Sequence, residues 1–266
     1  PSFQPDLSTT NDVVRQAVVP MSRTHAGGCA LATLWNEGRP VFAQRMVTHN
    51  WGNKFLHLVA AIVSDGLGCG SHYNTVATRL TEAGGIDRLR RVLERCGGLT
   101  MTYWVCAFSI NQHASICGGF GPAPQEGTPE RDEWERKRID TSSGAVFSVC
   151  LCTQPKFFND KPVECELNKF TDMMQFLHKE SNGFAQVVAL DEEFDLFSRA
   201  WCVAELVEAE VCRLPQVVKV HSPEAVDLHY DSLSLLDVRN CRASRSEDRQ
   251  LILDRILSFD AFNDRL

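Results

Sequence analysis

The sequence lacks a long hydrophobic run, an excess of positive charge and a glycine-rich phosphate motif, and each absence argues against a class of protein. No apolar run approaches the roughly 20 residues of a membrane-spanning helix, so we expect no membrane partner. The 34 acidic side chains outnumber the 27 basic ones and give a formal net charge of −7. Because nucleic-acid binders usually carry a basic face, we expect no nucleic-acid partner. No G-x-G-x-x-G or G-x-x-x-x-G-K-S/T motif follows a predicted strand, which argues against Rossmann-type and P-loop sites.

The first twelve residues also lack the basic segment followed by an apolar segment that marks a signal peptide. We therefore expect a cytoplasmic, reducing compartment in which thiols stay reduced. The chain has 11 cysteines, an odd number that cannot all pair with one another. The clustered cysteines are thus candidates for metal ligands rather than for disulfides.

Apolar runs rich in β-branched and aromatic residues alternate five times with helical patterns. The strands are predicted around Val47, Val105, Val188, Val218 and Leu236. The helices are predicted over residues 53–67, 84–98, 167–180, 199–213 and 246–259. Such alternation predicts a doubly wound α/β domain, with a parallel sheet and helices on both faces. We assign residues 40–266 to this domain and residues 1–39 to an N-terminal lead-in that is disordered in part.

Residues 113–166 interrupt the alternation between the second strand and its helix. This segment is far longer than an ordinary connection, so we interpret it as an insertion. Four cysteines within it form a candidate zinc site: Cys117, Cys150, Cys152 and Cys165, with His113 as a substitute ligand. Structural zinc takes four such ligands and can order a segment too polar to fold alone. The alternative is a set of ordinary reduced thiols.

Polar and aromatic side chains follow the first three predicted strands. Ligands of an open parallel sheet bind outside the carboxyl ends of its strands. The residues expected there are His49, Asn50 and Trp51 after the first strand, Phe108, Ser109 and Asn111 after the second, and Trp201 and Glu205 on the helix after the third. Together they predict a pocket for a flat, polar molecule rather than for a phosphate group.

The helix that carries Trp201 holds two candidate carboxylates. At 100° per residue, Trp201, Glu205 and Glu208 share one face, and Glu205 lies one turn nearer to the carboxyl edge. Beside an aromatic ring, a partly desolvated Glu205 can act as a base or stabilise positive charge, whereas we expect Glu208 to be solvated. Two alternatives stay open: Trp201 is an ordinary core residue, or Cys106 is a nucleophile with a histidine as its base.

Three blocks of this sequence resemble one family. The segment "SRAWCVAELVEA" is similar to the S-x-W-C-x-x-E-L segment of Toll/interleukin-1 receptor (TIR) domains, and "THNWGNKF" and "YWVCAFSINQH" look like parts of a TIR-like family of protist and algal proteins. The resemblance implies a flavodoxin-like, five-stranded parallel sheet with strand order 2-1-3-4-5. This sequence departs from the family pattern at two places. Cys106 stands where an acidic residue is usual, and the insertion falls where a self-assembly loop is expected.

The W-x-x-x-E spacing of Trp201 and Glu205 is that of the TIR domains that hydrolyse NAD. The resemblance therefore implies an NAD nucleosidase that cleaves the nicotinamide–ribose bond, with NAD as substrate and no catalytic cofactor. Glu205 would stabilise an oxocarbenium-like sugar, and Trp51 and Trp201 would stack on the bases. The alternative is a non-catalytic signalling module that works by assembly. In either case the resemblance implies homo-oligomers on activation.

Overall fold

Four parallel strands form the centre of the computed structural model, which describes residues 3–25, 27–156, 169–243 and 246–266. The strands are β3 (Arg45–His49), β4 (Tyr103–Val105), β5 (Ala185–Ala189) and β6 (Gln216–Lys219). They lie in the order β4-β3-β5-β6, with Val47 beside Val105 and Val187. The first four predicted strands are thus confirmed, and their order 2-1-3-4 agrees with the first part of the expected order.

The fifth predicted strand is wrong. The run around Leu236 contains the end of helix α12 (Tyr230–Ser234) and precedes a 3₁₀ turn at Val238–Asn240. The helix before it, α11 (Pro223–Leu228), starts at the cap residue Ser222, whose hydroxyl accepts a hydrogen bond from the Ala225 amide. The run is rich in leucine, which favours helices over strands. Leu235 is also largely exposed, so no buried strand face holds the segment extended.

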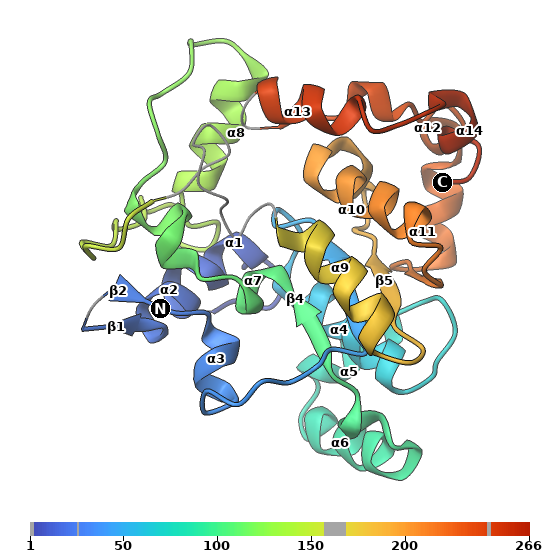
Figure 1. Ribbon diagram of the computed structural model, residues 1–266. Coiled ribbons are helices and arrows are strands. Elements are labelled where there is room, and N and C mark those ends of the chain that lie inside the picture. Colours follow the sequence, from blue (N-terminus) through green and yellow to red (C-terminus); the bar gives the residue numbers. More distant parts are fainter. Residues whose placement is uncertain (1–2, 26, 157–168, 244–245) are drawn as a thin grey trace.

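Each face of the sheet is covered by its own helices because successive strand residues point to opposite sides. Met46 and Val188 face a core built with α9 (Lys169–Glu180), α10 (Ala200–Val211) and α13 (Ser246–Leu253). Val47 and Val187 face a second core, built with α4 (Phe55–Gly66), α5 (Asn74–Thr81) and α6 (Gly85–Cys96). In Figure 1, α9 and α10 lie in front of the sheet and α4 lies behind it. The five predicted helices are all present.

The N-terminal segment, expected to be disordered in part, is folded over the residues that the structure describes. It forms α1 (Thr10–Val13), a π-helical turn at Val14–Val18, α2 (Val19–Met21), the strands β1 (Arg23–Thr24) and β2 (Gly27–Gly28), and α3 (Leu31–Trp35). Val14 and Val18 are fully buried in the second core. The Thr10 amide also donates to the Asn53 carbonyl, next to the carboxyl end of β3. The folded body therefore begins well before residue 40.

The insertion lies against this N-terminal segment. It starts beyond α7 (Cys106–Ser109) and includes two short 3₁₀ turns and α8 (Pro129–Arg138). Arg15 donates to the Ile116 carbonyl, and the Asn11 amide donates to the Lys137 carbonyl. Figure 1 shows α8 (green) and the N-terminal elements (blue) on the same side of the sheet. Residues 157–166 of the expected insertion lie outside the described residues.

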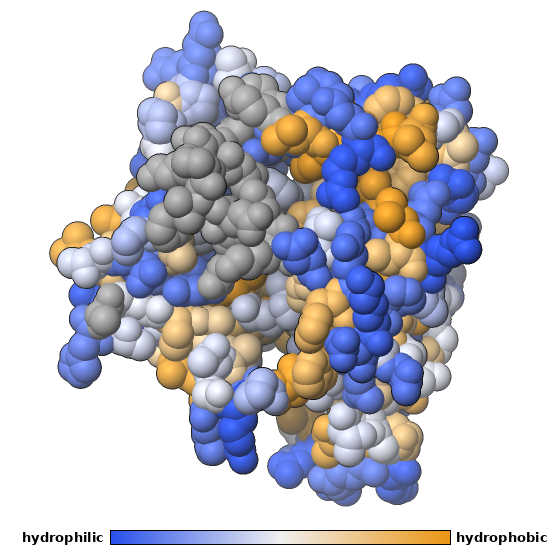
Figure 2. Space-filling view, viewed as in Figure 1, coloured by the Kyte–Doolittle hydropathy of each residue, from blue (hydrophilic) through white to orange (hydrophobic). Residues whose placement is uncertain are grey.

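Hydrophobic side chains gather on one part of the surface seen in Figure 2, over α13 and the helices beside it. Leu251 of α13 and Leu257, which precedes α14 (Phe259–Asn263), are exposed.

Among the helices that the structure describes, none combines the length and the apolarity needed to cross a bilayer.

Candidate functional site

His49 ends β3 at the carboxyl edge of the sheet and is buried. Its Nδ1 atom lies 3.4 Å from the Val47 carbonyl, and its Nε2 atom has no hydrogen-bond partner among the described residues. Burial, with a smaller contribution from the nearby charge of Arg199, lowers the pKa of the imidazole to about 4, although the contact with the Val47 carbonyl opposes this change. His49 is therefore a neutral ring at pH 7, with one nitrogen left unpartnered at the sheet edge.

Asn50 organises the loops that leave β3 and β5. Its side-chain oxygen accepts from the Gly52 amide at 2.9 Å, and its side-chain amide lies 3.5 Å from an Asp191 carboxylate oxygen. Asp191 in turn accepts from the amides of Asp195 and Leu196, at 2.7 and 2.9 Å. These contacts assign Asn50 a role in loop geometry.

Trp51 and Cys106 bring the ends of β3 and β4 together. The Trp51 indole N–H donates to the Cys106 thiol at 3.2 Å. Burial raises the pKa of that thiol to about 12, and the charge of Glu205 adds to the rise. Because only a thiolate is a strong nucleophile, these surroundings argue against the Cys106 nucleophile considered above.

Glu205 lies on α10, on the side that faces the sheet. Burial raises the pKa of its carboxyl to about 8, and a hydrogen bond with Thr48 of β3 offsets this rise only in part. The Thr48 hydroxyl also accepts from the Gln186 side-chain amide at 2.7 Å, and Gln186 lies 3.2 Å from the Glu205 carbonyl. Glu205 therefore sits in a hydrogen-bonded network of β3 and β5 beneath the carboxyl edge, close enough to Cys106 to act on it by charge.

Trp201 does not lie with Trp51. Its ring packs edge-on against Phe170 of α9, with 6.1 Å between ring centroids, and it belongs to the core under α9 and α10. Trp51 and Phe108 belong to the core on the opposite face of the sheet. The Phe108 ring lies 5.3 Å from the ring of Trp35 in the N-terminal segment. The two tryptophans expected as stacking walls thus pack on different faces.

Glu208 is fully buried, which corrects the expectation that it is solvated. It accepts from the Gln175 side-chain amide at 2.9 Å and pairs with Arg255, which lies just after α13. The helical pattern placed Glu208 on the correct face of α10. It did not reveal that α9 and the segment after α13 cover this part of the helix.

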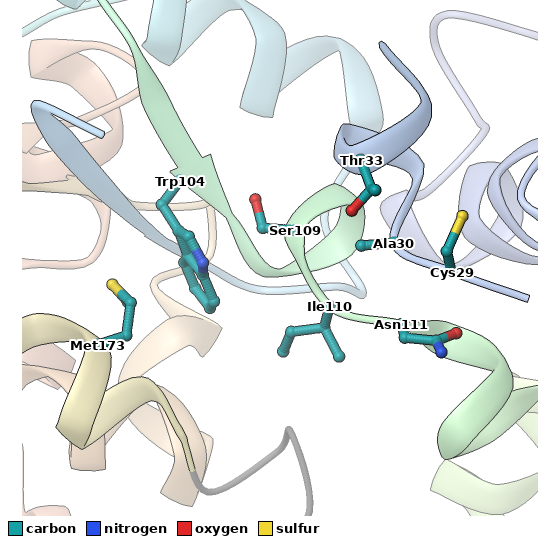
Figure 3. A pocket seen from close by; sticks show the side chains of 8 residues that line it. All are labelled: Cys29, Ala30, Thr33, Trp104, Ser109, Ile110, Asn111 and Met173. Atoms are coloured by element: carbon teal, nitrogen blue, oxygen red, sulfur yellow. The ribbon is translucent and has the colours of Figure 1, made fainter. Parts of the chain in front are cut away.

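Ser109 and Asn111 line a cavity of about 370 Å³ beside β4. In Figure 3, Trp104 and Met173 stand on one side of it and Cys29, Ala30 and Thr33 on the other, with Ser109 between them. The Ser109 hydroxyl accepts from the Val105 amide, and the Asn111 amide donates to the Gly28 carbonyl. A second cavity of about 310 Å³ adjoins the first and shares Thr33, Trp104 and Ser109 with it. Glu205 lines neither cavity.

A buried cluster of one histidine and three cysteines could bind a metal. Its members are His113, Cys117, Cys150 and Cys152, whose ligand atoms all lie within 4.8 Å of one another. The Cys117 and Cys152 sulfurs are 3.5 Å apart, and the Cys150 sulfur is 3.7 Å from His113 Nδ1. The expected set is thus brought together with its substitute ligand, while Cys165 lies outside the described residues. Every cysteine in the described part of the chain is a free thiol.

The surroundings of His113 leave one ring nitrogen available to a metal. Its Nε2 lies 3.0 Å from the Val19 carbonyl, which can only accept, so Nε2 carries the proton. The lone pair then belongs to Nδ1, on the side of the cysteines. Metal-bound histidines commonly donate their other ring N–H to a backbone carbonyl in this way.

Two residues that sequence reasoning missed shape this cluster. A Cβ atom on Gly28 would lie 2.0 Å from the His113 ring, so only glycine fits there. Lys156 donates to the His113 carbonyl at 2.7 Å and to the Cys152 sulfur at 3.2 Å. Burial opposes ionisation of Cys152, but hydrogen bonds to its sulfur, among them the one from Lys156, outweigh it and lower the pKa of the thiol to about 6. For Gly28, the sequence does offer one hint, because the stretch "HAGGCA" places a glycine pair beside a cysteine.

Comparisons of the chain with family models, with curated proteins and with solved structures each gave no match.

Proposed function

We propose that this chain is a TIR-like domain that cleaves the nicotinamide–ribose bond of NAD, with Glu205 as the catalytic carboxylate. The observation that carries the proposal is the position of Glu205: a desolvated carboxyl under the carboxyl edge of a parallel sheet, hydrogen-bonded with Thr48 and close to Cys106. Ligands of such sheets bind at this edge. Strongly shifted pKa values cluster at functional sites, where burial tunes a group for its task.

The chemistry requires little more than a well-placed negative charge. Loss of nicotinamide leaves an oxocarbenium-like ribose, and nicotinamide departs without a general acid. The Glu205 carboxylate stabilises that positive charge in surroundings where water screens it poorly. The nicotinamide ring of NAD is itself cationic, so bound substrate favours the ionised form of Glu205.

The aromatic wall of the proposed site is Trp51, which lies beside Cys106, rather than Trp201, which is packed against Phe170. The unpartnered Nε2 of His49 is available to a ribose hydroxyl or to the carboxamide of nicotinamide. Asn50 holds the loop geometry, and Ser109, Asn111 and Phe108 lie toward the N-terminal segment.

One observation favours the alternative, a TIR-type module that signals by assembly and does no chemistry. Neither described cavity is lined by Glu205, and residues of the N-terminal segment bond to the loop that holds Trp51. In this alternative Glu205 is a half-buried acid with a hydrogen bond to Thr48 and no catalytic role. Both functions imply self-association, which is why the test below uses concentrated protein.

We also propose that His113, Cys117, Cys150 and Cys152 hold a structural zinc ion. One histidine nitrogen and three sulfurs supply the four ligands that structural zinc takes, and the cluster joins the insertion to the N-terminal segment. Elemental analysis of the purified wild type and of the Cys150→Ser/Cys152→Ser variant tests this: we expect the wild type to hold close to one zinc per chain more than the variant, and a difference of less than about half an equivalent removes the proposal.

The proposed activity is tested by incubating concentrated protein with NAD and measuring free nicotinamide. We expect release by the wild type and its loss in the Glu205→Gln variant, which keeps the shape of the side chain. Glu210→Gln is the matched control, because Glu210 lies on the same helix but pairs with Arg265 at the surface. Release that is the same in all three proteins contradicts the catalytic assignment.

A further inference from the structure

A second group of metal-type side chains lies at the carboxyl edge of the sheet, apart from the cysteine cluster. It consists of His57, Glu192 and His221. His57 is in the first turn of α4, Glu192 follows β5, and His221 follows β6. One ligand atom from each lies within 4.8 Å of the other two. Three connections that are far apart in the sequence thus converge on one point.

The two histidines have unpartnered nitrogens at this point. His57 is 5% exposed, and neither its Nδ1 atom nor the Nδ1 atom of His221 has a hydrogen-bond partner among the described residues. The ring centroids are 4.9 Å apart. Leaving a buried polar atom unpaired is unfavourable, so two such atoms side by side need an explanation. A shared cation explains both.

Glu192, the third side chain of the group, supplies a negative charge and connects the group to solvent. A Glu192 carboxylate oxygen lies 3.8 Å from His221 Nδ1, too far for a hydrogen bond, and the side chain is 44% exposed. An ion can therefore reach the site from solvent along Glu192. The neighbouring Tyr73 is not a ligand, because its hydroxyl donates to the Leu190 carbonyl at 2.7 Å. Lys54, with its ammonium 3.9 Å from Glu192, is too distant to satisfy the carboxylate.

We propose that His57, Glu192 and His221 bind a divalent first-row transition-metal ion of the Zn²⁺ class. Two imidazoles and one carboxylate form a three-ligand set that leaves a coordination position open to water or to a small ligand. Tetrahedral ligands around zinc lie about 3.4 Å apart, so the side chains close by about 1 Å on binding. The ion ties the connections after β3, β5 and β6 together. This site is independent of the proposed NAD cleavage and of the cysteine cluster.

Cobalt titration of metal-free protein tests the proposal and separates the two metal sites. Cobalt bound by cysteine thiolates gives a sulfur-to-metal charge-transfer absorption, whereas the histidine site has no sulfur ligand and gives none. We expect the wild type to bind one Co²⁺ without that absorption. The double variant Cys150→Ser/Cys152→Ser should keep this equivalent, whatever the cysteine cluster does.

Glu192→Gln is the decisive variant, because it keeps the size of a half-exposed side chain and removes a charged ligand. We expect Zn²⁺ affinity at this site, measured by calorimetry in the Cys150→Ser/Cys152→Ser background, to fall about 10-fold or more. Glu193→Gln is the matched control, since Glu193 is 68% exposed and faces His229 instead. Affinity that is equal in the Glu192 and Glu193 variants overturns the proposal, as does a background protein that binds no metal. His221→Ala, checked for folding by circular dichroism, should abolish binding.

Discussion

Glu205 shows, at the scale of one residue, how a candidate catalytic group opposes stability. Folding raises the pKa of its carboxyl from 4.5 to about 8, chiefly because burial disfavours the charged form. Between these two pH values the folded protein keeps a proton that the unfolded chain has lost. The free energy of unfolding therefore falls as pH rises through this window, and the loss is complete above about pH 8. The ionised carboxylate at this position therefore lowers the free energy of unfolding, whereas a neutral side chain of the same shape would not.

The Glu205→Gln variant should accordingly be more stable than the wild type at pH 9. Glutamine fills the same space and never ionises, so we expect a gain of about 1–3 kcal/mol in the free energy of unfolding at that pH. At pH 5 the two proteins should differ little, because the wild-type carboxyl is then neutral. Urea unfolding at both pH values measures this. A variant that is less stable than the wild type at pH 9 contradicts the assigned pKa.

The same ionisation should appear in the pH profile of NAD cleavage. If the carboxylate is the active form, kcat/KM should rise about tenfold for each pH unit below about 8 and become level above it. The profile reports the free enzyme, so the charge of bound NAD does not obscure it. Nicotinamide release measured from pH 6 to pH 9.5 is the test. A flat profile over this range, with the enzyme still active, excludes Glu205 as the ionising group.

At the scale of elements, two of the three acids of α10 lie in different surroundings. Glu205 faces the sheet and has no ion pair among the described residues, whereas Glu208 is buried between Gln175 of α9 and Arg255 after α13. The sequence pattern was sufficient to predict the helix and the order of its acids along one face. It could not distinguish their surroundings, because the partners of Glu208 lie about 30 and 50 residues away in the sequence and those of Glu205, Thr48 and Cys106, lie farther still. The leucine-rich run near Leu236 was wrongly predicted to be a strand for a different reason, since leucine favours helices and Leu235 is exposed.

Arg255 stabilises the folded protein because it pairs with the buried carboxylate of Glu208. Arg255→Ala leaves the carboxylate in the core without its cation, and we expect a loss of about 2–4 kcal/mol in the free energy of unfolding. Arg265→Ala is the control, since its pair with Glu210 is largely exposed and should be worth less than about 1 kcal/mol. Chemical unfolding of both variants decides, and equal losses contradict this account of the α9–α10–α13 contact.

At the scale of the whole molecule, the N-terminal segment and the insertion form one body against the sheet, joined at the His113 cluster. Cysteines gathered in one irregular segment suggest a metal site. The sequence therefore predicted three of the cluster's ligands, with His113 as a substitute ligand. The contribution of the N-terminal segment could not be predicted, since helical turns of only three to five residues are too short to show a periodic pattern. Their burial depends on partners such as Ile116 and Asn53, which only the folded chain brings close.

A substitution at Gly28 tests the contact between the N-terminal segment and the His113 cluster. A Cβ atom there would overlap the His113 ring, so Gly28→Ala should cost about 1–3 kcal/mol in stability and displace a metal ligand. We expect zinc content to fall together with the melting temperature. Gly70→Ala is the control, because its added Cβ would meet nothing within 4 Å. Full zinc content in a stable Gly28→Ala protein contradicts the proposed role of His113.

The most direct test of the central claim is nicotinamide release from NAD by concentrated protein at pH 9, where Glu205 is ionised. We predict that Glu205→Gln reduces the rate by on the order of 10²–10³-fold, the usual effect of removing one preorganised electrostatic contact. Glu210→Gln should keep the wild-type rate. Equal rates for the wild type and a folded Glu205→Gln variant would contradict the account and leave the assembly module as the better assignment.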